Sequence, residues 1–103
     1  MASIKIRAKN SDGTTTVKAI IRHPMETGLR KDKKTGKMKP AHFIQEINCE
    51  HNGKNVMTAL WGIAISKDPY LSFKFKGAAA GDTVKLTWTD NQGNTDTKET
   101  QVK

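Results

Sequence analysis

The sequence is poor in cysteine, since Cys49 is the only one among 103 residues. A single thiol excludes an internal disulfide and any zinc site built from several thiolates. Reactive or carrier thiols need exposure and a mobile setting, whereas Cys49 lies in a strand-like segment between Asn48 and Glu50. We therefore expect Cys49 to fill part of a hydrophobic core, with a redox role left open.

Long hydrophobic runs are absent as well. No apolar stretch approaches the roughly 20 residues that a helix needs to cross a bilayer. Residues 1–9 also contain no apolar run of signal-peptide length. Taken alone, these residues indicate a cytosolic protein with no membrane contact.

Acidic residues are few, with ten Asp and Glu against eighteen Lys and Arg and a formal net charge of +8. Such a field attracts anions, which include nucleic acids, acidic proteins and small oxyanions. The carboxylates are scattered through expected turns and polar strand faces, and no pair of them can be assigned acid and base roles. We therefore expect no catalytic residues, no cofactor and no enzymatic activity.

Apolar and polar residues alternate with a period of two along much of the chain, and turn-forming residues interrupt the alternation at short intervals. This pattern is typical of strands with one buried and one exposed face. A chain of this length has room for one core. We therefore expect a single domain over residues 1–103 with an all-β fold, an immunoglobulin-like two-sheet β-sandwich of about seven strands. The expected strands cover residues 4–7, 17–22, 42–50, 56–61, 71–76, 84–88 and 95–103, the polar last one at an exposed edge.

The third of these strands allows two local predictions. Phe43, Ile47 and Cys49 are expected on one face of it, and Ile44 on the other. The Asn52-Gly53 pair that follows favours a two-residue hairpin loop, because both central residues of a type I′ turn need positive φ.

Positive charge is concentrated between Arg22 and His42. This segment contains seven Lys and Arg residues and two acids, Glu26 and Asp32, which gives it a net charge of +5. Structureless connections longer than about 12 to 15 residues are uncommon in compact domains and are usually functional or disordered. We interpret this segment as a docking surface for a protein partner or an anion; the alternative is a basic loop that is merely solvated. The predicted partner- and anion-binding residues are His23, Met25, Glu26, Arg30, Lys31, Lys33 and His42.

Within that segment, the planar guanidinium of Arg30 can donate two parallel hydrogen bonds to an oxyanion, and the ammonium of Lys31 supplies a compact positive charge. Residues 34–37 are expected to form the tip of a small hairpin that Met25, Leu29 and Met38 attach to the body of the protein. Nucleic-acid binding by a basic sandwich or barrel is the alternative function, but single-strand binders interleave cations with stacking aromatics, which the segment lacks. His23, Met25, His42, Cys49 and His51 fall near strand ends without the spacing of a ligand set, so no metal site is predicted.

Several motifs together closely resemble the SoxZ family over essentially the whole chain. SoxZ is the smaller subunit of the SoxYZ carrier of bacterial thiosulfate oxidation. The motifs are residues 23–32 (HPMETGLRKD), 40–44 (PAHFI), 51–54 (HNGK), 69–77 (PYLSFKFKG), and 81–82 with 90–91 (GD and DN).

The resemblance implies an immunoglobulin-like sandwich that forms a heterodimer with SoxY, which holds the sulfur intermediate on a cysteine of its glycine-rich C-terminal arm. It implies transient contacts with SoxAX-, SoxB- and SoxCD-type enzymes and no catalysis by this chain, which ends in ETQVK without such a cysteine. It also changes the expected location to the periplasm, because SoxZ-like chains are exported together with SoxY. The face that binds SoxY, and self-association when SoxY is absent, are left open.

Overall fold

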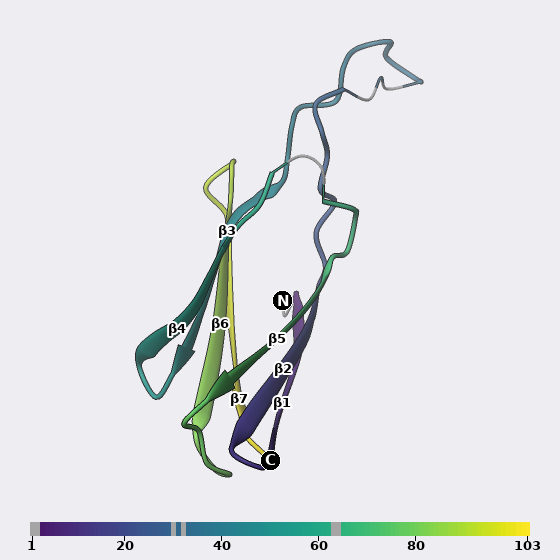
Figure 1. Ribbon diagram of the computed structural model, residues 1–103. Coiled ribbons are helices and arrows are strands. Elements are labelled where there is room, and N and C mark those ends of the chain that lie inside the picture. Colours follow the sequence, from purple (N-terminus) through teal and green to yellow (C-terminus); the bar gives the residue numbers. More distant parts are fainter. Residues whose placement is uncertain (1–2, 30, 32, 63–64) are drawn as a thin grey trace.

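The computed structural model describes residues 3–29, 31, 33–62 and 65–103 and consists of strands, turns and loops (Figure 1). None of the described residues forms a helix of the length and apolar character needed to span a bilayer. The seven strands are β1 (Ile4–Ser11), β2 (Thr14–Ile21), β3 (Ile44–His51), β4 (Lys54–Leu60), β5 (Tyr70–Lys76), β6 (Thr83–Asp90) and β7 (Thr95–Gln101).

The strands form two antiparallel sheets, which confirms the predicted sandwich. One sheet has the order β1-β2-β5 and the other the order β4-β3-β6-β7. This is an immunoglobulin-like arrangement in which the fourth strand pairs with the third. The polar strand β7 is an edge strand, as its composition predicted.

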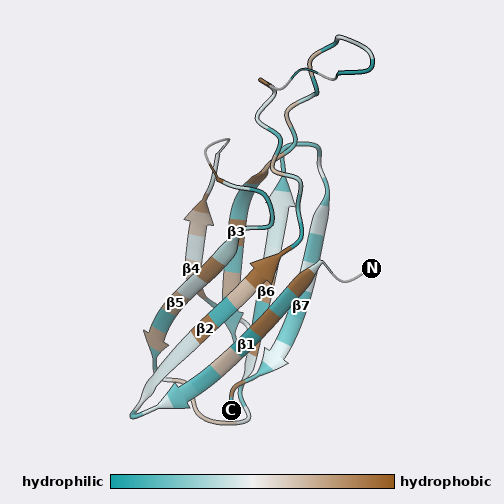
Figure 2. Cartoon of the chain, turned by 90° about the vertical axis from the view of Figure 1, so that its right-hand side faces the viewer, coloured by the Kyte–Doolittle hydropathy of each residue, from teal (hydrophilic) through white to brown (hydrophobic). Residues whose placement is uncertain are grey.

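Alternation places one face of each sheet against the other sheet (Figure 2). In β2, Val17, Ala19 and Ile21 are buried whereas Lys18 and Ile20 are exposed. Burial of apolar area at this interface is the main term that stabilises the fold. The core comprises Ile4, Ala8, Val17, Ala19, Ile21, Met25, Ile44, Ile47, Cys49, Ala78, Val84, Leu86, Trp88 and Val102.

One prediction about β3 is wrong. Ile44 is fully buried on the same side as Ile47 and Cys49, whereas Phe43 is only half-buried. The cause is a β-bulge: Ile44 pairs with Asp90 and Glu46 with Thr89, so Gln45 is an extra residue on β3. An extra residue reverses the side on which the preceding side chains lie.

The hairpin prediction for Asn52-Gly53 is confirmed, since both residues have positive φ, 48° and 87°.

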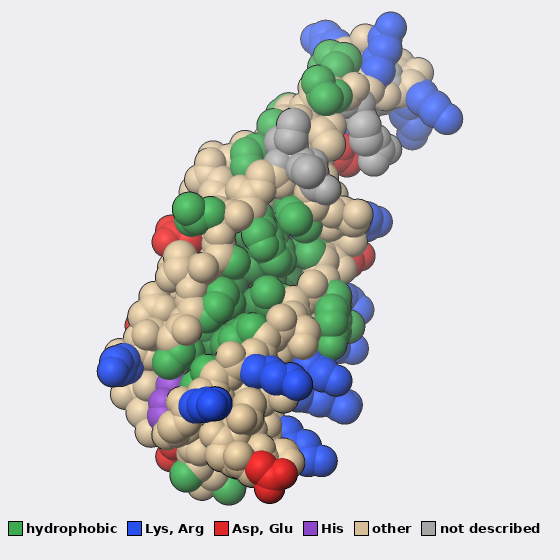
Figure 3. All heavy atoms as spheres, viewed as in Figure 1, with side chains coloured by type: hydrophobic (Ala, Val, Ile, Leu, Met, Phe, Trp, Pro, Cys, Tyr) green, Lys and Arg blue, Asp and Glu red, His purple; other side chains and the backbone are tan. Residues whose placement is uncertain are grey.

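The two long sides of the sandwich differ. Along the side where β1 meets β7, Asn10 N–H donates to Lys103 O and Lys103 N–H donates to Ala8 O. On the other side, β4 and β5 are the edges of opposite sheets, and apolar side chains are visible between them (Figure 3).

Candidate functional site

The basic segment between β2 and β3 leaves the end of the sandwich as a long, narrow excursion (Figure 1). Two bridges join its outgoing and returning halves, Glu26 with His42 near the sandwich and Lys31 with Met38 near the tip. At the first bridge, Glu26 and His42 exchange both backbone hydrogen bonds, at 2.6 and 2.9 Å. The predicted hairpin tip is therefore present as one end of a two-stranded ribbon.

The predicted attachment of this ribbon is right for Met25 and wrong for Leu29 and Met38. Met25 is 5% exposed and belongs to the core, but Leu29 is 74% and Met38 53% exposed. The ribbon carries the last two residues beyond the reach of the sandwich, where they have little apolar surface to cover.

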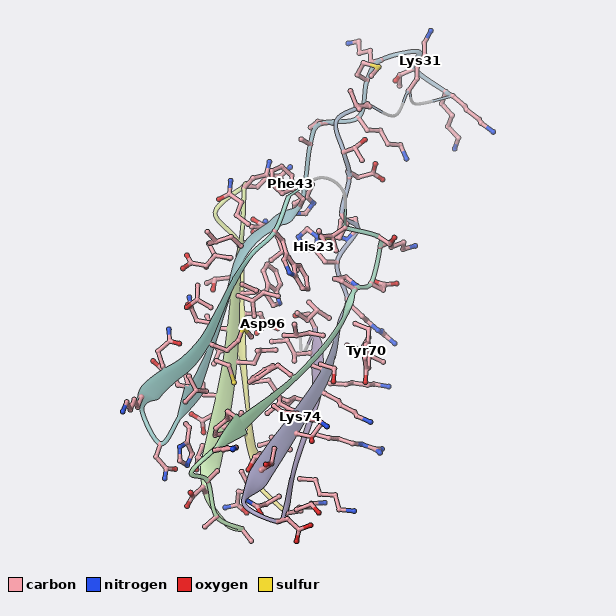
Figure 4. The ribbon with its side chains drawn as sticks, in the orientation of Figure 1. His23, Lys31, Phe43, Tyr70, Lys74 and Asp96 are labelled. Carbon is pink, nitrogen blue, oxygen red and sulfur yellow. The ribbon has the colours of Figure 1, made fainter. Side chains whose placement is uncertain are left out.

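A buried carboxylate, Asp90, holds the base of the ribbon. It is the last residue of β6, and its side chain is fully buried. Nε2 of His23 lies 3.0 Å and Nε2 of His42 2.7 Å from the same oxygen, Oδ2. Figure 4 shows His23 at this junction between the sandwich and the ribbon. Both ends of the segment are thus joined to one residue of β6, which lies in the sheet opposite β2 and beside β3 in its own sheet.

The turn between β6 and β7 completes the hydrogen bonding of this carboxylate. The backbone N–H groups of Gln92 and Asn94 donate to Asp90 Oδ1 at 3.0 and 2.8 Å. The Asn94 side-chain amide donates to Oδ2 at 3.2 Å. Burial acts to raise the pKa of Asp90, but the hydrogen bonds from His23, Asn94 and His42 outweigh it and hold the pKa well below its usual range.

The tautomer of His23 follows from its other neighbour. The Met25 N–H donates to His23 Nδ1 at 3.1 Å, so in the neutral ring the proton is on Nε2 and is donated to Asp90. The Met25 backbone has φ 48°, and its Sδ accepts the Ile44 N–H at 3.3 Å. Met25 therefore fixes the ring of His23 and the start of β3 together.

The same three side chains carry atoms that can act as metal ligands. The ligand atoms of His23, His42 and Asp90 lie within 4.8 Å of one another, which is close enough for one ion to contact all three. A metal needs the lone pair of His23 Nε2, and the Met25 N–H that faces Nδ1 disfavours the tautomer that would free it. The cluster therefore fits a hydrogen-bonded clamp better than a metal centre.

The third histidine is separate from this cluster. Nε2 of His51 lies 2.7 Å from Oδ2 of Asp82, at the hairpin between β3 and β4. The backbone N–H of Ala79 donates to the same oxygen, and together with His51 it lowers the pKa of Asp82. This pair joins the β3–β4 hairpin to the loop before β6.

The seven residues predicted as a binding site do not form one site. His23, Met25, Glu26 and His42 lie at the base of the ribbon, where the first two are buried. Lys31 and Lys33 are exposed near the tip, with Lys31 at the far end in Figure 4. Arg30 lies outside the described residues. Binding of a ligand or partner by any of the seven stays a prediction.

Asp90 is the residue that sequence reasoning missed. Its side chain binds His23 and His42, which are 67 and 48 positions away, and that proximity depends on how the two sheets pack and how β3 pairs with β6. A partial signal was present in residues 90–94 (DNQGN), since Asp and Asn side chains that accept N–H groups two residues on are typical of turns.

Cys49 is a core residue, as predicted. Its side chain is fully buried, and burial, with a contribution from Glu50, raises the pKa of the thiol to about 12. The protonated thiol is a poor nucleophile at neutral pH.

The chain was compared with known proteins. No curated protein sequence matches it. A family described as "Sulphur oxidation protein SoxZ" matches residues 4–101 of the 103. This match covers β1 to β7 and the whole basic segment between β2 and β3. The chain therefore belongs to the SoxZ family and is a component of a sulfur-oxidation (Sox) system.

Proposed function

We propose that this protein is the non-catalytic subunit of a SoxYZ carrier in thiosulfate oxidation. In this role it forms a heterodimer with SoxY, whose C-terminal cysteine holds the sulfur intermediate, and presents the lysine-rich ribbon to SoxAX-, SoxB- and SoxCD-type enzymes. The observation that carries the proposal is the construction of the ribbon: its base is clamped to the core by Asp90, and its tip exposes Lys31, Lys33 and Lys37.

The burial of Cys49 argues that this chain does not itself carry the sulfur intermediate. A carrier thiol must reach the active sites of other enzymes as a thiolate, whereas Cys49 is fully buried with a pKa raised to about 12. The sulfur intermediate therefore needs a thiol from another chain.

Electrostatics supports the docking role. Exposed cations at the end of a projecting ribbon raise the rate of encounter with acidic surfaces and with anionic intermediates. A ribbon fixed at its base also limits the conformational entropy that is lost when a partner binds its tip.

The test uses the complete chain co-expressed with SoxY. Gel filtration is expected to show one complex, and Lys31→Glu/Lys33→Glu/Lys37→Glu is expected to leave that complex intact. The same variant should raise the KM of at least one Sox enzyme for the carrier, because the approaching surface meets the wrong charge. Lys54→Glu/Lys67→Glu/Lys103→Glu is the matched control, since all three lysines are exposed and outside the ribbon. Separate elution of the two chains would overturn the assignment, and unchanged kinetics of the ribbon variant would overturn the docking role.

We further propose that the protein works in the periplasm and is exported together with SoxY. The support is the family resemblance, in which the partner bears a twin-arginine signal that serves both chains. Fractionation of cells with and without that signal on SoxY is the test; a periplasmic pool of this chain that persists without it would contradict co-export.

A further inference from the structure

The outer face of the β1-β2-β5 sheet carries an unusual distribution of charge. Along β1 the side chains that point away from the core are mostly cationic and exposed, and β2 and β5 add exposed Lys18, Lys74 and Lys76. In Figure 3, Lys and Arg side chains line the right-hand margin of the body, over β1 and β2. The cations of this face, named the basic face below, are Lys5, Arg7, Lys9, Lys18, Arg22, Lys74 and Lys76, and no carboxylate among the described residues points outward from the same three strands.

Pairing between strands brings like charges together on the basic face. Arg7 of β1 lies directly opposite Lys18 of β2. Lys9 and Lys74 flank Thr16 from the two neighbouring strands. Like charges directly opposite each other in a sheet are destabilising. No ion pair with a carboxylate offsets this repulsion in the described part of the chain, so an anionic partner would relieve it.

The outer face of the other sheet shows the contrast. There Lys85 of β6 lies between Glu50 of β3 and Glu99 of β7, so that unlike charges are neighbours across the strands. Glu46 is a third acid on that face. The surplus of cations is therefore a local feature of one sheet and not a uniform consequence of the basic composition.

An apolar pair lies within the basic face. Ile20 of β2 is paired with Tyr70 of β5, and these side chains are 45% and 58% exposed. Lys5 is the partner of Ile20 on β1, and Lys18 and Arg22 precede and follow it on its own strand face. Asp68 also lines the hollow beside Ile20, together with Lys5 and Arg22. A tyrosine and an aliphatic side chain flanked mainly by cations have the composition of a protein-binding hot spot, in which Tyr and Arg are enriched.

We propose that the basic face is a second docking surface, separate from the ribbon and from the SoxY interface, that binds an acidic protein surface with an apolar centre. The cations supply attraction and orientation, and Ile20 with Tyr70 supplies buried apolar area. Nucleic acid fits this face less well, because Tyr70 is its single aromatic residue and an exposed aliphatic side chain gains nothing from phosphates.

Binding of peptide probes to the isolated full-length chain tests the proposal. The first probe is a peptide of Glu-Glu-Leu repeats, about nine residues long so that it matches one strand of the sheet. The second is poly-glutamate of equal charge, and the third is a single-stranded oligonucleotide of equal charge. We expect the order of affinity to be leucine-containing peptide, poly-glutamate, oligonucleotide, and we expect the first peptide to protect Lys5, Lys18 and Lys74 from acetylation.

Variants locate the binding. Lys18→Glu/Lys74→Glu is expected to weaken binding of the first peptide at least about tenfold at low salt, because two attractive contacts become repulsive. Lys54→Glu/Lys67→Glu, with the same change in net charge, should change it by less than about twofold, since those lysines lie outside the face. Ile20→Ser/Tyr70→Ser should abolish the preference for the leucine-containing peptide and keep binding of poly-glutamate.

Three results would overturn the proposal. The first is equal or tighter binding of the oligonucleotide, which would make the face a nucleic-acid surface. The second is wild-type affinity in Lys18→Glu/Lys74→Glu. The third is loss of acetylation of Lys5, Lys18 and Lys74 when SoxY is bound, which would make the face the subunit interface. None of these results depends on the activity of a Sox enzyme, so they are independent of the role of the ribbon.

Discussion

His42 donates through Nε2 to Oδ2 of Asp90 over 2.7 Å, although the two residues are 48 positions apart; His42 ends the segment between β2 and β3, and Asp90 ends β6. The contact joins the returning half of the basic ribbon to the turn that follows β6. Since His23 shares the same oxygen, one carboxylate fixes the point at which the ribbon both leaves and re-enters the sandwich.

Replacement of this carboxylate should be costly. Asp90→Asn removes the charge and replaces one of the two acceptor oxygens by an amide N–H₂, so that at least one donor of the buried network faces another donor. We expect a loss of about 3 kcal/mol in the free energy of unfolding, which is the range for breaking a buried charged network. Urea denaturation followed by tryptophan fluorescence measures it. Asp82→Asn is the control: it breaks a similar contact, to His51, but the Asp82 side chain is 27% exposed, so its loss should be clearly smaller.

Acid should weaken the same clamp. The pKa of Asp90 is lowered in the folded protein, so its contribution to stability is fully present above the pKa of an unfolded aspartate, about 3.9, and is lost as the pH falls below it toward the folded pKa. We expect the free energy of unfolding to fall between about pH 5 and pH 2, and to fall less steeply in Asp90→Asn. Equal slopes in the two proteins would contradict a protonation-linked role of Asp90.

The strands were predictable because alternation in this chain is regular. In β2 the buried positions, and in β5 the half-buried ones, follow the period of two that the sequence displays. Asn52-Gly53 specified its own hairpin through local backbone chemistry. Gln45 could not be recognised as a bulge, because a bulge depends on how β3 is paired with β6 and leaves no mark on the composition of β3.

The binding surfaces were only partly predictable for a related reason. The charge of the ribbon is contiguous in sequence, so it could be found by counting. The basic face combines β1 and β2 with β5, which lies about fifty residues further along the chain, and becomes visible only from the strand order. The link between His23, His42 and Asp90 likewise depends on packing of the two sheets.

Gly28, at the base of the ribbon, should be destabilised by any added side chain. It has φ +84°, and a Cβ there would lie 3.1 Å from the Cβ of Ala41 on the returning half. Gly53 has a similar φ of +87° but open space around it. We expect Gly28→Ala to lower the free energy of unfolding by about 1 kcal/mol more than Gly53→Ala. Both variants place an alanine at a strained positive φ, but only the new Cβ at position 28 is crowded by a neighbouring side chain. Thermal or urea unfolding of the two variants measures the difference, and equal losses would mean that the halves of the ribbon are not held together at Ala41.

Cys49 should be inert in the folded protein. Because the thiol is buried and its pKa is raised to about 12, almost none of it is thiolate at neutral pH. We expect negligible reaction with iodoacetamide or a disulfide reagent at pH 8 in native conditions, and complete reaction in urea. Rapid labelling of the native protein would contradict burial of this side chain and reopen a redox role for it.

The basic face makes a prediction about stability that is opposite in sign to its effect on binding. Lys18 lies opposite Arg7, so Lys18→Glu replaces a repulsive cross-strand pair with an attractive one. We expect the free energy of unfolding to rise by roughly 0.5 to 1 kcal/mol at low salt, and the gain to shrink as salt screens the pair. Lys54→Glu, at an exposed position next to the β3–β4 hairpin, is the control for the change in net charge.

Combining Arg7→Glu with Lys18→Glu restores a like-charged pair and should remove the pairwise gain, which a double-mutant cycle measures directly. A lower stability of Lys18→Glu at low salt would show that the cations of this face do not repel one another, and the main physical reason for expecting an acidic partner there would be lost.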